Sequence, residues 1–266
     1  MKKNKYALIT GGGGLLGIEH AFALSEVGYK IILIDKNQKK LKTAKKKFYN
    51  KIKSHCLILN CDISKEDEVL NCRDILKKKK IFVNTLVNNA DHNPKMMSLK
   101  SFNNLKNYSV QMLQEQLDVG VIGTFNCIKI FGHEMEKKGG GIIINVSSDL
   151  GINAPDQRVY SKDEKIQNVK NFKPIGYSIS KHAIIGITKY IATYWAHKNI
   201  RCNTLVPGAV INNQHKNLVD NVKKRIPLNR WAKKNEYRKG LQFLASEDNS
   251  YMTGQSIIID GGRSAW

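Results

Sequence analysis

A tyrosine and a lysine four residues apart are the strongest candidates for chemistry in this sequence. The run Tyr177-Ser-Ile-Ser-Lys181 places a phenol and an ammonium on one face at the start of a predicted helix. A tyrosine with a pKa of about 10 is a poor base at neutral pH, and lowering that pKa by about three units takes roughly 4 kcal/mol. We expect the positive charge of Lys181 to supply this stabilisation.

A serine hydroxyl is expected beside this pair. Residues 141–147 are predicted to form a strand, and Ser148 follows at its carboxyl end. Reduction of a carbonyl builds negative charge on oxygen, which the hydroxyl groups of Ser148 and Tyr177 can stabilise before Tyr177 protonates it. Alone, Tyr-x-x-x-Lys is a weak pattern, because a tyrosine can stack on a neighbouring lysine stem by chance. The serine upstream strengthens it.

A glycine-rich turn after the first predicted strand indicates dinucleotide binding. Gly12, Gly14 and Gly17 fit the pattern Gly-x-Gly-x-x-Gly between that strand and a predicted helix. In this position backbone amides and the helix N-terminus can receive a pyrophosphate. The same glycines elsewhere in a chain would indicate only a tight turn.

An acidic residue closes the second predicted strand. Asp35 lies eighteen positions after Gly17, where a carboxylate can accept hydrogen bonds from the adenosine ribose. A 2′-phosphate would meet like charge there, although Lys36 follows directly and could offset part of the repulsion. We therefore expect NAD as the cofactor, with NADP less favoured.

Strands and helices are expected to alternate along the chain. Apolar runs rich in β-branched residues predict seven strands at residues 6–10, 30–35, 56–60, 83–88, 141–147, 200–206 and 256–260. Helical periodicity marks residues 15–27, 41–52, 101–135 and 177–197. Such alternation predicts an α/β fold of Rossmann type, a doubly wound parallel sheet with helices on both faces. Ligands bind such a sheet at the carboxyl ends of its strands.

The composition is that of an ordinary globular domain. The 266 residues are 41% apolar, which favours one domain over residues 1–266. No stretch approaches the roughly 20 apolar residues that span a bilayer, and the first residues lead straight into a predicted strand. We expect a cytoplasmic protein with no membrane partner. Five cysteines without a Cys-x-x-Cys pair predict reduced thiols and no metal site.

Basic residues outnumber acidic residues by 44 to 22, which raises the question of a nucleic-acid partner. The lysines gather on polar faces of predicted helices, within residues 36–53 and 77–80. No nucleic-acid-binding motif with interleaved aromatic residues accompanies them. We favour a solvated lysine-rich surface over a nucleic-acid site.

Taken together, these motifs resemble the short-chain dehydrogenase/reductase family, and the resemblance covers essentially the whole chain. The length and the C-terminal half are similar to its shorter dehydrogenase branch, whereas the glycine spacing is more usual in its epimerase and dehydratase branch. The matching blocks are residues 10–17, Asp62, residues 88–90, Ser148, Tyr177, Lys181, residues 207–208 and residues 259–262.

The resemblance implies a role for each block. Tyr177 would donate or accept the proton, Ser148 would orient the substrate oxygen, and Lys181 would hold the nicotinamide ribose, while hydride passes directly between cofactor and substrate. Homo-oligomers, dimers or tetramers, are also implied. The cofactor-binding residues expected are Thr10, Gly11, Gly14, Leu15, Leu16, Gly17, Asp35, Asp62, Ile63, Asn89, Ala90, Tyr177, Lys181, Pro207, Gly208 and Val210.

Two positions depart from the family pattern. Gly120 stands where the family often has a catalytic asparagine, which puts the usual water-mediated proton relay from lysine in doubt. Asn212 stands where a threonine often contacts the nicotinamide amide.

Residues 151–174 form a long polar segment between the catalytic hydroxyls. Loops longer than about 12 to 15 residues are uncommon in compact domains and are usually lids, binding loops or disordered. We interpret this segment as a substrate-loop insertion in which Gln157, with Asp156, Arg158 and Tyr160, contacts the substrate. The alternative is a crossing loop that contributes to subunit contacts. Together with Gln157, Ser148 and Tyr177 are the expected substrate residues.

The substrate is a small molecule whose class stays open. The runs at residues 10–17, 154–157 and 264–266 are similar to bacterial members of the family associated with surface-polysaccharide or flagellin sugar biosynthesis, which favours a sugar or sugar phosphate. The first alternative is a 3-oxoacyl-carrier-protein reductase, because a basic surface suits acidic acyl carriers. A catalytically silent dinucleotide-binding or RNA-associating module is the second.

Overall fold

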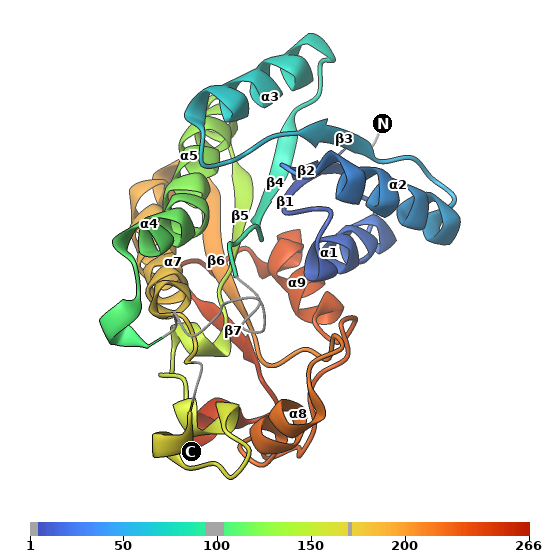
Figure 1. Cartoon of the computed structure of the whole chain (residues 1–266). Helices are drawn as coiled ribbons and strands as arrows, with labels where there is room; N and C mark the ends of the chain where they lie inside the picture. Colours follow the sequence, from blue (N-terminus) through green and yellow to red (C-terminus); the bar gives the residue numbers. More distant parts are fainter. Residues whose placement is uncertain (1–4, 94–103, 170–171) are drawn as a thin grey trace.

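Seven parallel strands form one sheet through the centre of the molecule (Figure 1). The computed structural model describes residues 5–93, 104–169 and 172–266. The strand order is β3-β2-β1-β4-β5-β6-β7. The strands are β1 (Tyr6–Thr10), β2 (Lys30–Asp35), β3 (Leu57–Asn60), β4 (Val83–Asn88), β5 (Gly141–Val146), β6 (Ile200–Pro207) and β7 (Ser256–Ile259). The predicted doubly wound Rossmann-type sheet, in a single α/β domain, is confirmed.

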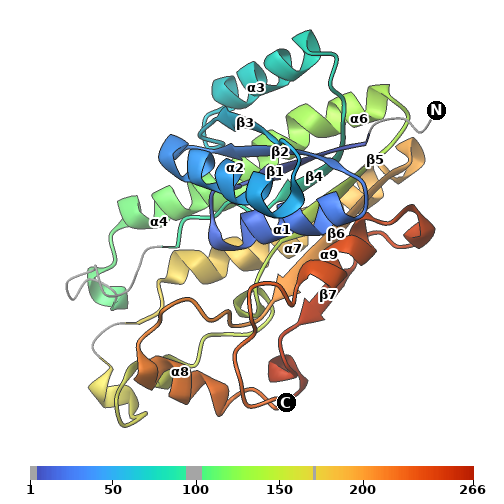
Figure 2. The same cartoon turned by 90° about the vertical axis from the view of Figure 1, so that its right-hand side faces the viewer.

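Helices cover both faces of this sheet (Figure 2). They are α1 (Leu15–Glu26), α2 (Gln38–Ile52), α3 (Glu66–Lys78), α4 (Val110–Leu117), α5 (Thr124–Cys127), α6 (His133–Lys137), α7 (Ile175–Tyr194), α8 (Lys216–Lys223) and α9 (Arg238–Ala245). One core joins the sheet to α1, α2 and α9, through Phe22, Phe48 and Leu241. The other joins it to α3, α7 and the helix between them, through Leu76, Ile191 and Phe131.

The strands read as continuous apolar runs because they are covered on both sides. In β2, residues 31–34 are all buried, with Leu33 in one core and Ile32 in the other. Parallel registers such as Leu8 with Ile32 and Leu86 align the carboxyl ends of β1, β2 and β4 at one edge. The strand order reverses between β1 and β4, and ligands bind such sheets at this switch point.

Three helices were not predicted, and one begins later than predicted. The helix predicted at residues 101–135 corresponds to a helical rod of five consecutive parts. In chain order they are α4, a π-helical turn at Asp118–Gly123, α5, a second π-helical turn at Ile128–Gly132, and α6. It begins at Val110; residues 101–103 lie outside the described residues. The missed helices α3, α8 and α9 have polar sequences, and the latter two have only eight residues each.

Candidate active site

Tyr177 and Lys181 lie one turn apart on α7, which packs against β5 and β6. The Nζ atom of Lys181 donates a hydrogen bond of 2.9 Å to the carbonyl oxygen of Val146, at the end of β5. The same Nζ atom forms an ion pair of 3.0 Å with Oδ2 of Asp91, and both side chains are almost fully buried. It lies 5.7 Å from the centroid of the Tyr177 ring. The structure thus brings the expected pair together at the carboxyl edge of the sheet.

Two adjacent serines follow β5, and their hydroxyl groups make different hydrogen bonds. Ser147 Oγ donates a 2.7 Å hydrogen bond to the carbonyl oxygen of Lys181, which fixes α7 against the sheet. Ser148 Oγ donates to Oδ1 of Asp149 at 2.8 Å, and Ser148 lies close enough to Tyr177 to lower the pKa of its phenol. The expected serine therefore faces the expected tyrosine.

The pKa of Tyr177 is raised, which makes our expectation from the sequence wrong. Burial of the phenol is the largest cause, because it penalises the phenolate, and the negative charge of Asp91 is the second. Ser148 opposes both. The lowering expected from Lys181 is absent because the carboxylate of Asp91, 3.0 Å from the ammonium, offsets its charge.

Charged side chains that the sequence analysis did not single out complete the site. Asp91 directly follows the Asn-Asn-Ala block after β4. The carboxylate of Asp149 is buried and pairs with Nη1 of Arg263 at 2.5 Å. Lys173 places its Nζ atom 3.9 Å from the centroid of the Tyr177 ring. Asp149 and Lys173 could have been found as neighbours of Ser148 and Tyr177 in sequence, whereas nothing in the sequence links Arg263 to Asp149.

The glycine-rich turn between β1 and α1 has the shape of an anion cradle. Gly11 has a φ of +61°, and a Cβ atom there would lie 2.9 Å from Cα of Ala90. A Cβ atom on Gly17 would lie 2.3 Å from the carbonyl oxygen of Gly11. Gly14 caps α1 without a side-chain hydrogen bond, so the first amides of the helix, at Leu15 and Leu16, are left for an anion. These residues fit a dinucleotide pyrophosphate.

Thr10 and Asn89 tie the two strands that flank this cradle. Thr10 Oγ1 accepts hydrogen bonds of 2.9 Å from the backbone amides of Asn89 and Ala90. The side-chain amide of Asn89 donates to the carbonyl oxygen of Thr10 at 3.0 Å. Their polar atoms are therefore used to align β1 with β4, and they shape the crevice rather than project into it.

The adenosine end of the crevice lies beyond β2 and β3. The carboxylate of Asp35 accepts hydrogen bonds from the amides of Gly13, at 3.1 Å, and Asn37, at 2.9 Å. Lys36 Nζ lies 3.8 Å from Oδ2 of Asp62, and the pKa of Asp62 is lowered despite its partial burial, by hydrogen bonds from Ser64 and by Lys36 and Lys65. Ile63 is buried next to it. A cavity of about 170 Å³ opens here, lined by Lys36, Ser64, His92, Glu115, Asp118 and Val119.

The segment after β6 lies on the other side of the crevice. Gly208 donates to the carbonyl oxygen of Ile259 at 2.9 Å, and a Cβ atom on Gly208 would lie 2.7 Å from Cα of Asp260. Pro207 ends β6, and Val210 pairs with Ala232 in an isolated bridge. Asn212 is exposed, and its backbone amide donates to Gln214 at 2.6 Å.

Gly120 lies in the first π-helical turn, where the rod meets α7. A Cβ atom on Gly120 would lie 2.0 Å from Oγ of Ser180 and 2.9 Å from Oδ1 of Asp91. An asparagine therefore has no room at this position in the present packing. The carboxylate of Asp91 lies beside the space that such a side chain would enter.

The structure describes residues 151–169 and 172–174 of the polar segment after Ser148, and this part, which we call the polar wall, lies next to α8 (Figure 1). Its turns include Gln157–Tyr160 and Ile166–Asn168. Arg225, just after α8, pairs with Asp156 at 2.5 Å and with Glu164 at 2.6 Å. Oε1 of Gln157 accepts a 2.8 Å hydrogen bond from the backbone amide of Lys173. Gln157 thus acts on the site through the position of Lys173.

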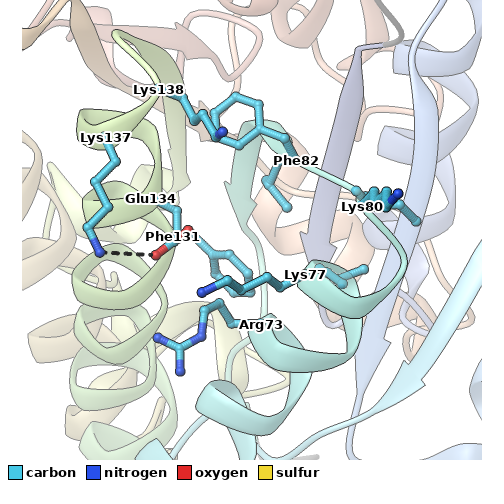
Figure 3. A pocket seen from close by; sticks show the side chains of 11 residues that line it. Arg73, Lys77, Lys80, Phe82, Phe131, Glu134, Lys137 and Lys138 are labelled. Carbon is cyan, nitrogen blue, oxygen red and sulfur yellow. Dashed lines mark ion pairs between the residues drawn. The ribbon is translucent and has the colours of Figure 1, made fainter.

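A larger cavity of about 470 Å³ lies at the opposite edge of the sheet, where β4 begins (Figure 3). Its floor includes Phe82 and Phe131, and lysines rim it. Lys137 pairs there with Glu134 at 3.6 Å. None of the expected catalytic or cofactor residues lines it, so we place the chemistry at the carboxyl edge, where ligands of such sheets bind.

Three further findings concern the cysteines, metal ligands and membrane spans. All five cysteines are free and buried. Within the described ranges, no group of three or more His, Cys, Asp or Glu side chains could hold a metal ion. Across those same residues, no helix has the length and apolarity to span a bilayer.

Comparisons with known proteins agree with this geometry. Residues 15–264 match the family described as enoyl-(acyl carrier protein) reductase. The 3-oxoacyl-[acyl-carrier-protein] reductase of Staphylococcus epidermidis is 28% identical, over 97% of this chain and 98% of that protein. A short-chain dehydrogenase of Leptospira borgpetersenii with bound NAD⁺ has a TM-score of 0.84 at 28% identity, covering 98% of this chain and 93% of that chain. A gluconate 5-dehydrogenase of Burkholderia cenocepacia, in complex with NADP and tartrate, has a TM-score of 0.84 at 25% identity, covering 98% and 96%.

Proposed function

Because the chain belongs to the short-chain dehydrogenase/reductase family and is an NAD(P)-dependent oxidoreductase, we propose that it interconverts a secondary alcohol and a ketone on a small polyhydroxylated substrate. The substrate class we propose is a sugar or sugar phosphate used for surface glycans. The observation that carries the proposal is the meeting of Ser148, Tyr177 and Lys181 at the carboxyl edge, beside the glycine cradle.

Each of these residues has a role that follows from its contacts. Ser148 lies next to the phenol of Tyr177 and orients the substrate oxygen by hydrogen bonding. Tyr177 donates its proton to the oxygen that gains negative charge during reduction, and takes it back during oxidation. Lys181, held by Val146 and Asp91, positions the ribose next to the tyrosine. The nicotinamide, when bound, supplies or accepts the hydride.

NAD is the cofactor that we propose. The carboxylate of Asp35 lies at the end of β2 and is fixed there by the amides of Gly13 and Asn37. A 2′-phosphate would meet this negative charge, whereas ribose hydroxyls can donate to it. Lys36, the next residue, forms an ion pair with Asp62 at 3.8 Å. Similar structures bind NAD or NADP, so the preference depends on this chain's own residues.

A polyhydroxylated substrate is supported by two observations. Gluconate 5-dehydrogenase, one of the similar structures, acts on a hydroxylated acid and holds tartrate. In this chain, the described residues 151–169 and 172–174 form a polar wall that we propose as the substrate loop, because it joins the segment of Ser148 to that of Tyr177. Polar walls suit substrates with many hydroxyl groups, since each buried hydroxyl needs a hydrogen-bond partner.

A 3-oxoacyl-[acyl-carrier-protein] reductase is the second candidate function. The relative from Staphylococcus epidermidis supports it, and so does the net charge of +22, because acyl carrier proteins are acidic. Both functions use the same hydroxyl groups on the same kind of carbonyl. They differ in the substrate that the polar wall must admit.

We also propose that the protein works in the cytoplasm as a homo-oligomer. Apolar side chains remain exposed on the helical rod and α7, where two copies of the chain would pair helix against helix; they include Ile122, Phe125, Ile179, Tyr190 and Tyr194. Two of them, Tyr190 and Tyr194, stack with ring centroids 5.9 Å apart.

The experiment is a cofactor titration followed by turnover assays. NADH and NADPH binding is measured by thermal shift, and NADH formation or consumption is then followed with sugar phosphates, nucleotide sugars and acetoacetyl thioesters. We expect Tyr177→Phe to lower kcat by at least about 100-fold while the Kd of NADH stays the same, because the phenol handles a proton and holds little of the dinucleotide. A Tyr177→Phe enzyme with more than about a tenth of wild-type kcat would refute the assignment.

A further inference from the structure

Two lysines lie at the ring of Tyr177, and the carboxylates of Asp91 and Asp149 lie near enough to act on its phenol. Lys181 pairs with Asp91 at 3.0 Å, and Arg263 pairs with Asp149 at 2.5 Å. Lys173 is the third cation. Its Nζ atom lies over the Tyr177 ring at 3.9 Å. Among the described residues it forms no ion pair with a carboxylate, so the site carries one positive charge that the described side chains do not balance.

The only polar contact of the Lys173 ammonium within the described residues is weak for a cation. Nζ donates a 3.0 Å hydrogen bond to the neutral Oδ1 of Asn93, an exposed residue. An ammonium offers three donors, and one amide oxygen satisfies one of them. Removing the ammonium from water is costly, and burial lowers the pKa of Lys173 to about 8, against the opposing pull of Asp91 and Asp149. Lys181 lowers it further.

The backbone holds Lys173 in this position. Its amide donates to Oε1 of Gln157 at 2.8 Å, which anchors it to the polar wall. Pro174, the next residue, precedes the first turn of α7 and fixes the chain there with a φ of −54°. A fully exposed lysine would move freely in solvent. Lys173 is half-buried, and its Nζ atom lies over the ring that carries the reacting hydroxyl.

We propose that Lys173 binds an anionic group, a carboxylate or a phosphate, on the substrate whose alcohol or ketone reacts at Tyr177. The inference rests on the proposed function and narrows its substrate class to anionic polyhydroxylated molecules. The ammonium of Lys173 lies over the ring of Tyr177, which carries the reacting hydroxyl. The anionic group must therefore be attached to the substrate close to the reacting carbon. A cation–π contact alone would place a lysine here without a ligand, and the test separates the two roles.

The test uses three polyols that differ in their charge. Glucitol is neutral, gluconate carries a carboxylate in place of one terminal alcohol, and glucitol 6-phosphate carries a phosphate. Their binding to the enzyme with NADH is measured by isothermal titration calorimetry, together with the Kd of NADH itself. In wild-type protein we expect at least one of the two anions to bind about tenfold more tightly than glucitol, which corresponds to about 1.4 kcal/mol. The anion that binds more tightly than glucitol shows whether the site prefers a carboxylate or a phosphate.

Substitutions then assign this preference to one side chain. Lys173→Met should remove the advantage of the anion, Lys173→Arg should keep it, and the exposed Lys162→Met should leave it unchanged. The Kd of NADH should be the same in all variants. Melting temperatures show which variants are folded. If Lys173→Met does not fold, Lys173→Arg keeps the test valid.

Two outcomes would overturn the proposal. One is equal binding of glucitol and both anions by wild-type protein, and the other is an anion preference that survives in folded Lys173→Met. Both are distinct from failure of the proposed function, which would appear as absent NADH binding or as no turnover with any alcohol or ketone.

The pH dependence gives an independent check on the same group. Because the pKa of Lys173 is about 8, anion binding should weaken as pH rises through that value and the ammonium loses its proton. Tyr177, Asp91, Asp149 and Lys181 also face this group, so glucitol serves as the control. Its affinity should change little over the same range. An anion affinity that stays constant from pH 6.5 to about 9.5, well above this pKa, would contradict the assignment.

Discussion

Tyr177 handles the proton in the proposed reaction, and the charges around it set the pH at which it does so. Burial and the carboxylate of Asp91 raise its pKa, while Ser148 lowers it. A base with a raised pKa is mostly protonated at neutral pH, which suits donation of a proton to a carbonyl oxygen.

Asp91→Asn tests this balance. Removing the negative charge should lower the pKa of Tyr177, so the acid limb of the pH profile for alcohol oxidation should move to lower pH. The profile of kcat/KM with NAD⁺ measures it, and Asp163→Asn, on an exposed turn, is the matched control. An acid limb that stays in place or moves to higher pH would show that Asp91 does not govern Tyr177.

Asp35 has two functions that can be separated. Its carboxylate holds the amides of Gly13 and Asn37, and its charge faces the position of a 2′-phosphate. Asp35→Asn keeps an acceptor and removes the charge, so the ratio of the Kd values for NADP and NAD should fall by about tenfold, the effect of about 1.4 kcal/mol. Fluorescence titration with NADH and NADPH measures it. A ratio that does not change would mean that the charge of Asp35 plays no part in the choice.

At the scale of elements, Gly120 joins the helical rod to α7. A Cβ atom on Gly120 would lie 2.0 Å from Oγ of Ser180, so the Ser180 side chain must rotate or one of the two elements must move. We expect Gly120→Ala to lower the free energy of unfolding by about 1 to 3 kcal/mol, as overpacking does. Denaturant unfolding measures it. Ser180→Gly in the same chain should restore part of the loss; a double variant as unstable as Gly120→Ala would place the cost elsewhere.

Within the polar segment, Gln157 contacts the backbone of Lys173, and we propose that it acts on the site in this way. The Oε1 atom of Gln157 accepts a hydrogen bond from the amide of Lys173, whereas Arg158 is exposed and pairs with Asp156 in the same turn. Gln157→Ala should therefore raise the KM of the substrate several-fold without changing the Kd of NADH, and Arg158→Ala should behave as wild type. Steady-state kinetics distinguish them. Equal effects of the two substitutions would favour a general role of the segment, such as a subunit contact.

The strands and the pairing of Tyr177 with Lys181 could be predicted because each depends on neighbours in the sequence. All seven strands lie within one or two residues of their predicted bounds, since buried parallel strands are continuous apolar runs. Helices α8 and α9 could not be predicted, because eight residues hold too few turns for a clear period. The ion pairs of Lys181 with Asp91 and of Asp149 with Arg263 join residues far apart in sequence, and only the folded sheet brings them together.

At the scale of the whole molecule, the exposed apolar side chains on the rod and α7 call for a partner. Phe125 and Tyr190 are 49% and 66% exposed, which is costly for large apolar groups that gather on two adjacent helices. We expect light scattering to give a homo-oligomer for wild type and a smaller species for Phe125→Glu. Thr43→Glu, on the exposed face of α2, is the control. A monomeric wild-type protein at assay concentration would contradict this.

The pair of Asp149 with Arg263 also bears on how the protein is made. These residues are 114 positions apart, so at about 5 to 20 residues per second the ribosome needs roughly 6 to 23 s to deliver the arginine after the aspartate. A carboxylate without its partner resists burial during that interval. The nascent chain therefore keeps the end of β5 in water until β7 has emerged, and the catalytic edge is closed only late in translation.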